Sequence, residues 1–206
     1  DTAQRQMVTS GEIYFKRALK IAERSPDLDW QELANAKLAL ADNYTYVQSQ
    51  NRARKLYNEL WTFLSADEER LAFRAETLEQ PVALFADNLP RYAFSGADAN
   101  TPTDDLLTGT IRVDYTVSTR GRVRNIRTEA IPPEFTDMQR MVHREIRRRA
   151  YRPKITDDGP SESDNLLFEH NFFYRQLDLD ALRKDTGEPA QRSSDEPQDD
   201  GTDKQR

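Results

Sequence analysis

The chain has 206 residues, a formal net charge of −6 and a hydrophobic fraction of 36 %, a size that accommodates one or two domains. It contains no cysteine and two histidines, which excludes a disulfide framework, a thiolate zinc site and a thiol nucleophile. No segment reaches the roughly 18 consecutive apolar residues that a membrane-spanning helix requires.

Residues 1–78 are predicted to form an all-α unit. They contain a single glycine and a single proline, and apolar residues recur at steps of three and four. The expected helices cover 7–23, 30–48, 52–64 and 66–78, and Ser65 is expected to cap the last of them. One side of the first helix gathers apolar side chains and is expected to be buried: Ile13, Tyr14, Ala18, Ile21 and Ala22.

A pattern of residue types recurs within this unit, with each member of the second copy 42 positions after its counterpart. The copies are Gly11, Phe15 and Ala18, and then Ala53, Tyr57 and Leu60. The pattern resembles the tetratricopeptide (TPR) repeat, in the longer-helix form found in kinesin light chains. The resemblance implies that six residues pack between the helices of an array: Leu40, Ala41, Tyr44, Ala53, Tyr57 and Leu60. An ordinary helical bundle with a chance repeat is the alternative.

Residues 79–108 are predicted to connect this unit to a second domain. Pro81, Pro90, Gly96 and Pro102 interrupt any regular periodicity there. Apolar residues before position 95 predict that 81–94 packs along a domain surface, and 95–105 is expected to be the flexible part.

The segment 109–176 begins with the pattern of a β-hairpin. From Gly109, apolar residues alternate with polar ones, which predicts a half-buried strand that buries Ile111, Val113, Tyr115 and Val117. A turn at 119–122 leads to a return strand at 123–130, whose irregular alternation predicts a β-bulge.

A helix and a last strand complete this second domain. Pro132 and Pro133 introduce the helix, whose apolar side is expected to be Phe135, Met138, Val142, Ile146 and Ala150. After a loop at 157–164, residues 165–175 are expected to form a strand that buries Leu166, Phe168, Phe172 and Tyr174. The chain is therefore predicted to be α+β, with all-α helical repeats followed by a β-β-α-β domain.

The segments 109–126, 147–153 and 165–172, together with Phe135, resemble the C-terminal domain of TonB, the periplasmic energy transducer of Gram-negative bacteria. In that family the last strand is an open sheet edge, to which an extended peptide of an outer-membrane receptor adds as a further strand. The resemblance implies that such a peptide pairs with Asn165, Leu166, Leu167, Phe168, Glu169, His170 and Asn171.

The chain departs from the family pattern ahead of the first strand, and its last strand need not be open. The family's Tyr-Pro pair ahead of the first strand is absent, and only Pro90-Arg91-Tyr92 stands near its place. The edge could also be covered by the connector or by the segment after Arg175, which leaves self-coverage as the alternative.

Arginines gather around the end of the helix, and five of them are expected to form a basic surface: Arg140, Arg144, Arg147, Arg148 and Arg152. The dipole at a helix C-terminus favours cations, so most of these charges need no ligand. The acidic overall charge and the lack of an aromatic platform argue against nucleic acid. Anionic envelope polymers or acidic partners fit the charge better.

The sequence does not support catalysis. His143 and His170 are expected to be surface or packing residues. The acidic pairs at 104–105, 157–158 and 199–200 lie in expected loops or in the tail, with no histidine at ligand spacing. The chain is therefore predicted not to be an enzyme, and neither a metal nor a cofactor is expected.

Residues 177–206 are predicted to be an acidic, disordered tail. Beyond Leu182 the only apolar residue is Ala190, so little burial could offset the entropy lost on ordering.

Together these features predict a periplasmic adaptor, which binds one envelope protein in the groove of the helices and captures an extended peptide by strand addition. Two alternatives stay open: a membrane-anchored TonB-type energy transducer that contacts inner-membrane motor proteins, and a structural homo-oligomer of the envelope. Because the first residue is Asp1, a signal or anchor is expected to precede it. Membrane contact is expected only through that segment or through a partner.

Overall fold

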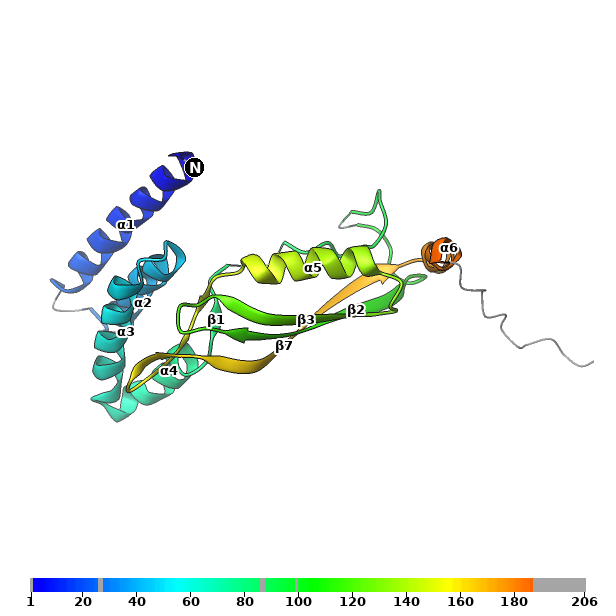
Figure 1. The fold of residues 1–206 in the computed structure, drawn as a ribbon. Helices are drawn as coiled ribbons and strands as arrows, with labels where there is room; N and C mark the ends of the chain where they lie inside the picture. The colour runs from blue at the N-terminus through cyan, green and yellow to red at the C-terminus, as the bar shows by residue number, and fades with distance from the viewer. Residues whose placement is uncertain (1, 26–27, 86–87, 99, 187–206) are drawn as a thin grey trace, which may run out of the picture.

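The structure, a computed structural model, describes residues 2–25, 28–85, 88–98 and 100–186, and for 2–10 and 185–186 it describes the backbone alone. The fold is mixed helix and sheet, which confirms the predicted α+β class. Figure 1 shows the helical unit at one end of the molecule and the main sheet extending away from it. The part of the predicted tail at 187–206 lies outside the described residues.

The helical unit contains α1 (Thr2–Ala22), α2 (Trp30–Tyr46), α3 (Gln50–Ser65) and α4 (Glu68–Leu78), each packed on the next. The last three lie within two residues of the predicted bounds. The predicted cap of α4 is wrong, because Asp67 rather than Ser65 accepts the first free N–H, from Glu69 at 3.2 Å.

The predicted buried side of α1 is also wrong, except for Ala22. Ile13, Tyr14 and Ile21 are 62 %, 71 % and 57 % exposed. The opposite side of the helix packs instead, with Phe15 and Leu19 against the helical core. Gly11 permits this approach, because a Cβ there would lie only 3.3 Å from Asn43 Nδ2 of α2. The helix has two apolar sides, and the sequence alone did not decide between them.

The main sheet is antiparallel, with β2 (Leu107–Val117) between β3 (Val123–Ile131) and β7 (Ser163–Tyr174). The helix α5 (Thr136–Arg148) covers one face (Figure 1). The core between them contains residues that the sequence predicted: Ile111, Val113, Tyr115, Val117, Phe135, Met138, Val142 and Ile146. The predicted bulge is confirmed by a register shift between Asp114 and Thr116, opposite which Asn125 has a φ of 50°.

The first part of the predicted tail is a helix, α6 (Gln176–Thr186), so disorder from residue 177 is wrong for this part. Leu179 is buried in the sheet core, and Leu182 packs beside it. Asp178 caps the helix by accepting the N–H of Arg175 at 3.0 Å and its guanidinium at 2.6 Å. Two leucines, this cap and the ion pair of Arg183 with Glu134 thus hold the acidic helix against the sheet domain.

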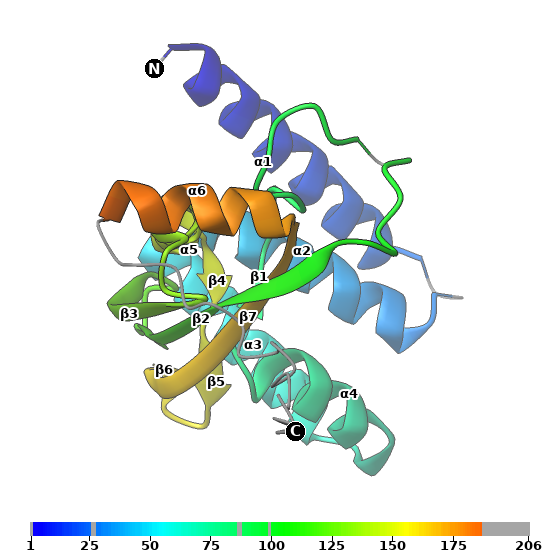
Figure 2. The same cartoon turned by 90° about the vertical axis from the view of Figure 1, so that its right-hand side faces the viewer.

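Short strands join the sheet to the helices. β1 (Val82–Ala83) pairs with β4 (Tyr151–Arg152), so the start of the connector packs as predicted. The expected loop after Thr156 is a hairpin of β5 (Lys154–Thr156) and β6 (Gly159–Ser161), which lies beside α3 in Figure 2. Its Ile155 is fully buried in the helical core. The chain itself therefore fills this face of the helices.

Candidate functional site

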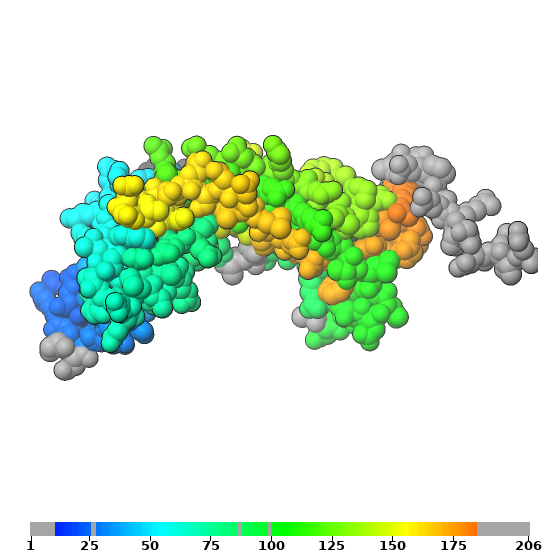
Figure 3. Space-filling model, turned by 90° about the horizontal axis from the view of Figure 1, so that it is seen from below, coloured from blue at the N-terminus to red at the C-terminus, as the bar shows by residue number. Residues whose placement is uncertain are grey.

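β7 lies at an edge of the main sheet and has β2 as its only full partner among the described strands. Its register pairs Val113 with Phe168 and Ile111 with His170. Seen from below in Figure 3, residues coloured yellow to orange run from the helical unit toward the C-terminal end, and the outline is hollowed beside them. The predicted peptide-binding stretch at 165–171 therefore belongs to an edge strand.

Side chains of β7 alternate between the two faces of the sheet, as its sequence predicted. Leu166, Phe168, Phe172 and Tyr174 contact the sheet core. On the other face Leu167 is 60 % exposed, Glu169 accepts from Arg112 Nε at 3.1 Å, and Asn171 accepts from the Thr110 hydroxyl at 2.9 Å. These side-chain bonds tie β7 to β2 and leave its outer edge untouched.

The connector covers the C-terminal end of that outer edge. Phe173 donates its N–H to Arg91 O at 2.8 Å and accepts from the N–H of Ala93 at 2.9 Å. His170 Nε2 lies 2.9 Å from Pro90 O, and because a carbonyl only accepts, Nε2 carries the proton in this bond. The Pro90–Tyr92 segment thus shields the edge at one end, as the alternative of self-coverage anticipated.

The rest of the edge is open over a shorter stretch than the sequence predicted. Backbone groups of alternate residues in a strand point to the same side. Since Phe173 directs its N–H and C=O outward, Asn171, Glu169 and Leu167 do the same, and no hydrogen bond from another described segment reaches these groups. At Asn165 a φ of 55° interrupts the regular strand. The open edge therefore spans 167–171.

Aromatic and cationic side chains border this open edge. The guanidinium of Arg149 lies over the ring of Phe168 at 4.3 Å, and that of Arg91 lies over Phe173 at 5.2 Å. Stacked cations of this kind hold aromatic rings in place.

The structure separates the five arginines of the predicted basic surface. Arg140, Arg144, Arg147 and Arg148 are exposed on α5, and Arg140 pairs with Asp137 at 3.1 Å. Placing Arg152 on this surface is wrong, because it is only 7 % exposed. Its guanidinium binds both carboxylate oxygens of Asp42, at 2.9 and 2.6 Å, and the carbonyl of Thr77 at 2.6 Å.

Arg152 belongs to a polar network that joins the helices to the sheet domain. Burial disfavours its cation, but the bonds to Asp42 outweigh burial and raise the pKa of Arg152. Burial, and then the charge of Asp42, raise the pKa of Tyr57 well above its usual value. The Tyr57 hydroxyl therefore stays protonated and donates to Asp42 Oδ1 at 2.8 Å, while Thr45 lies 2.9 Å away. Sequence reasoning missed Asp42 as a partner, since no local pattern links it to position 152.

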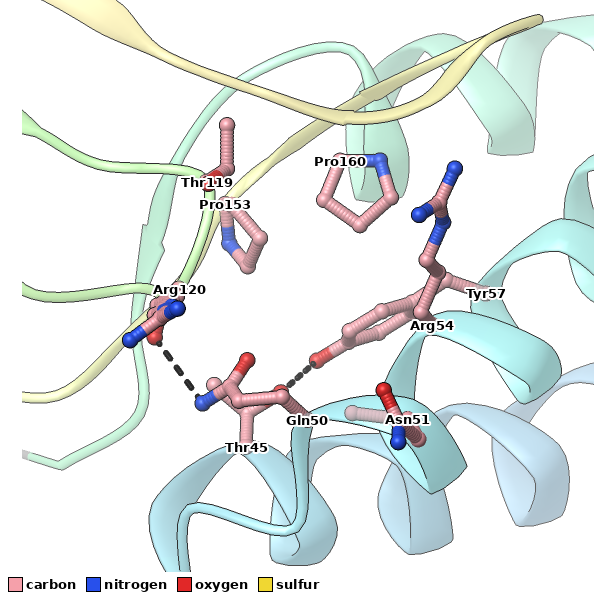
Figure 4. A pocket seen from close by; sticks show the side chains of 10 residues that line it. Thr45, Gln50, Asn51, Arg54, Tyr57, Thr119, Arg120, Pro153 and Pro160 are labelled. Atoms are coloured by element: carbon pink, nitrogen blue, oxygen red, sulfur yellow. Dashed lines mark hydrogen bonds between the residues drawn. The ribbon is translucent and has the colours of Figure 1, made fainter.

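A cleft of about 340 Å³ lies beside this network, between the N-terminus of α3 and the hairpin turn after β2 (Figure 4). Gln50 Nε2 donates to Arg120 O across it at 3.4 Å. Among the described residues that line the cleft there is no carboxylate and no histidine: Thr45, Gln50, Asn51, Ala53, Arg54, Tyr57, Thr119, Arg120, Pro153 and Pro160. This lining supplies no general acid–base pair.

The six residues that the repeat pattern placed between helices are all buried in the helical core: Leu40, Ala41, Tyr44, Ala53, Tyr57 and Leu60. Their counterpart Ala18 on α1 is exposed. The repeat pattern thus predicts packing correctly in α2 and α3, and in α1 it does so at Gly11 and Phe15 but not at Ala18.

No protein-family profile matches the chain, and no curated protein matches it significantly in sequence. None of the described helices is both long enough and apolar enough to cross a membrane. Within the described residues, no group of three or more histidine or carboxylate side chains is arranged to hold a metal ion.

Proposed function

We propose that the chain is a non-catalytic adaptor of the Gram-negative periplasm, with a TonB-like domain that captures an extended peptide of an envelope protein by strand addition. The open edge of β7 at 167–171 carries this proposal. Five residues of strand span about 17 Å, enough to pair with a short peptide through main-chain bonds.

The covered end of β7 supports the same mode of binding. There the chain's own segment around Tyr92 runs parallel to the strand and exchanges backbone bonds with Phe173. A captured peptide would repeat this pairing on the neighbouring outward groups of Asn171, Glu169 and Leu167. Because the connector occupies position 173, the peptide would have to stop short of it.

The helical unit has a supporting role in this proposal. We propose a TPR-like array, but the hairpin that carries Ile155 fills the face formed by α2, α3 and α4. A partner groove on that face would require the hairpin to leave. The array therefore holds the sheet domain in place and leaves its two outermost helices for other contacts.

A backbone test separates edge pairing from side-chain contact. Peptides that bind the full chain would first be selected from a random peptide library, and their affinity measured by fluorescence anisotropy. Leu167→Pro removes one outward N–H and adds a ring on the edge, so we expect affinity to fall at least about tenfold. Leu167→Thr keeps the N–H, and we expect it to bind as the parent does.

Hydrogen exchange provides the second readout, and it does not depend on how well the proline variant folds. With a selected peptide bound, the amides of Leu167, Glu169 and Asn171 should exchange more slowly than in the free chain. Protection confined to other elements, or a folded Leu167→Pro chain with parental affinity, would rule out capture at this edge.

A further inference from the structure

The two outermost helices of the array present faces of opposite charge. The outer side of α1, extended by Arg24 two residues past its end, is formed by exposed residues, none of them acidic: Ile13, Tyr14, Arg17, Ala18, Lys20, Ile21 and Arg24. Glu23, which directly follows the helix, is exposed as well and borders this side. The outer side of α4 is formed by exposed residues, none of them basic: Glu68, Glu69, Leu71, Ala72, Ala75 and Glu76. Each side combines apolar area with charges of a single sign.

These two sides lie at opposite ends of the molecule's helical unit. α1 packs on α2, and α4 packs on α3. Figures 1 and 2 both show α1 at one extreme of the stack and α4 at the other. A single copy therefore cannot bring them together, whereas two copies can.

The charges on both sides lack partners within the described part of the chain. No ion pair joins Arg17, Lys20 or Arg24 to a described carboxylate. On α4 the nearby pairs use other carboxylates: Asp67 with Arg70, and Glu79 with Arg74. The dipole at the α4 N-terminus accounts for Glu68 and Glu69 in its first turn, but Glu76 lies in the last turn, where a carboxylate is unfavourable.

We propose that copies of this chain associate head to tail, with the outer side of α1 in one copy against the outer side of α4 in the next. A contact between two α1 sides would oppose cations, and one between two α4 sides would oppose carboxylates. Charge therefore disfavours both symmetric dimers and favours the heterologous contact, which generates open chains rather than closed pairs.

The shapes of the two sides suit helix-on-helix packing. The small side chains of Ala72 and Ala75 permit close approach to α4, so that the large side chains of Ile13, Tyr14 and Ile21 can pack against it. Arg17 lies between Ile13 and Ile21 on one row of α1, where a facing carboxylate can neutralise it. An anionic membrane is a poorer match, because Arg17 would lie deepest in the hydrocarbon.

The expected association is weak. One helix against one helix buries less than the roughly 1,000 Å² of a stable complex, so assembly should depend steeply on concentration. Electrostatic attraction across such an exposed contact should also fall as salt rises, since screening shortens to a few ångströms at high ionic strength.

Charge reversal on the full chain tests the proposal by sedimentation velocity. R17E/K20E/R24E makes both end faces acidic, and E68K/E69K/E76K makes both basic, so each variant alone should stay monomeric. Mixed at equal concentration, the two variants present complementary faces at both ends and should associate again. A matched control, Arg148→Glu, changes an exposed arginine on α5 and should leave association unchanged.

Further measurements on near-parental chains keep the test decisive if a triple variant folds poorly. Tyr14→Ala should weaken self-association at least about tenfold, because aromatic anchors dominate contacts of this kind. Association of the parent should weaken between about 20 mM and about 500 mM salt. A parent that is monomeric at all concentrations up to the millimolar range, or that forms a closed dimer insensitive to Tyr14→Ala and to salt, overturns the proposal. Folded triple variants that fail to associate when mixed do the same.

Discussion

Arg148 and Arg152 stand four residues apart in one basic run, yet they have opposite environments. Arg148 is exposed at the end of α5, while Arg152 is buried and bonded to Asp42 of α2. The sequence does not distinguish them, because both belong to one basic run around the end of the same helix and carry the same charge. What separates them is a carboxylate 110 positions away in the chain. A run of like charges can therefore supply residues both to a surface and to an interface between domains.

Removing the buried cation is expected to destabilise the chain most. Arg152→Met leaves the carboxylate of Asp42 largely buried without its partner, and the carbonyl of Thr77 without a donor. We expect the free energy of unfolding to fall by about 3–5 kcal/mol in urea titrations. Arg148→Met, the matched change on the surface, should shift it by less than about 0.5 kcal/mol.

A double-mutant cycle distinguishes the loss of the ion pair between Asp42 and Arg152 from the loss of side-chain packing at Arg152. Asp42→Asn removes the charge on the other side, and the D42N/R152M chain contains neither charge. Because the two residues share one interaction, we expect the double variant to lose less stability than the sum of the single variants. Additive losses would mean that packing of the Arg152 side chain, and not the ion pair, stabilises the interface.

The region around the buried Arg152 can also be destabilised through the hairpin turn after β2, which packs against Tyr151. Gly121 has a φ of 69°, and a Cβ there would collide with the carbonyl of Tyr151, the neighbour of Arg152. We expect Gly121→Ala to cost about 2–4 kcal/mol in thermal or urea unfolding, from left-handed backbone strain and from the collision.

Gly96 supplies the matched control for that change. Its φ is 83°, but a Cβ there would meet nothing within 4 Å. Gly96→Ala therefore reports backbone strain alone, about 1–2 kcal/mol. Equal losses at the two glycines would show that the contact with Tyr151 is unimportant.

Local periodicity explains why much of the fold could be predicted. The alternation in β2 and the three-four spacing in α5 are set by which side chains face one core, so Val113 and Val142 were placed correctly. Features that depend on a distant partner could not be placed this way. Arg152 needs Asp42, the first part of the predicted tail needs the sheet core for Leu179, and α1 needed α2 to choose between its two apolar sides.

The candidate site was likewise predicted in part from local sequence, while the rest of it depends on distant segments. The sequence located the edge strand, because the alternation of Leu166 and Phe168 belongs to β7 itself. It could not limit the open stretch to 167–171, since one boundary is made by the connector at Phe173 and the other by the backbone turn at Asn165. Coverage of an edge is a tertiary property, and no residue pattern within the strand reports it.

The ion pair of Arg183 with Glu134, which is partly buried, makes stability depend on pH. The guanidinium of Arg183 bonds Glu134 at 2.6 Å and, against the effect of burial, lowers the pKa of Glu134 below its ordinary value of 4.5. The folded chain therefore holds this carboxylate ionised where the unfolded chain protonates it. The contribution of this ion pair to the free energy of unfolding is therefore complete above the ordinary pKa of glutamate. It is lost as the pH falls through the lowered pKa of Glu134.

Glu134→Gln should therefore reduce stability by at most about 1 kcal/mol at pH 7, with a difference that shrinks below the ordinary pKa. Urea titrations of the parent and the variant across the acid range measure this convergence. Two curves separated by the same amount at every pH would assign the effect to side-chain shape rather than to charge.

The smallest change in stability is expected at Arg148, the exposed residue at the end of α5. Arg148→Gln relieves repulsion from Arg144 one turn earlier and removes a cation from the helix C-terminus, where the dipole favours it. These opposing changes are each a few tenths of a kcal/mol, so the free energy of unfolding should stay within about 0.5 kcal/mol of the parent. Arg149→Gln is the informative neighbour, because its guanidinium stacks on Phe168 at 4.3 Å. It should cost about 1 kcal/mol, and equal effects at 148 and 149 would mean that stacking adds nothing beyond charge.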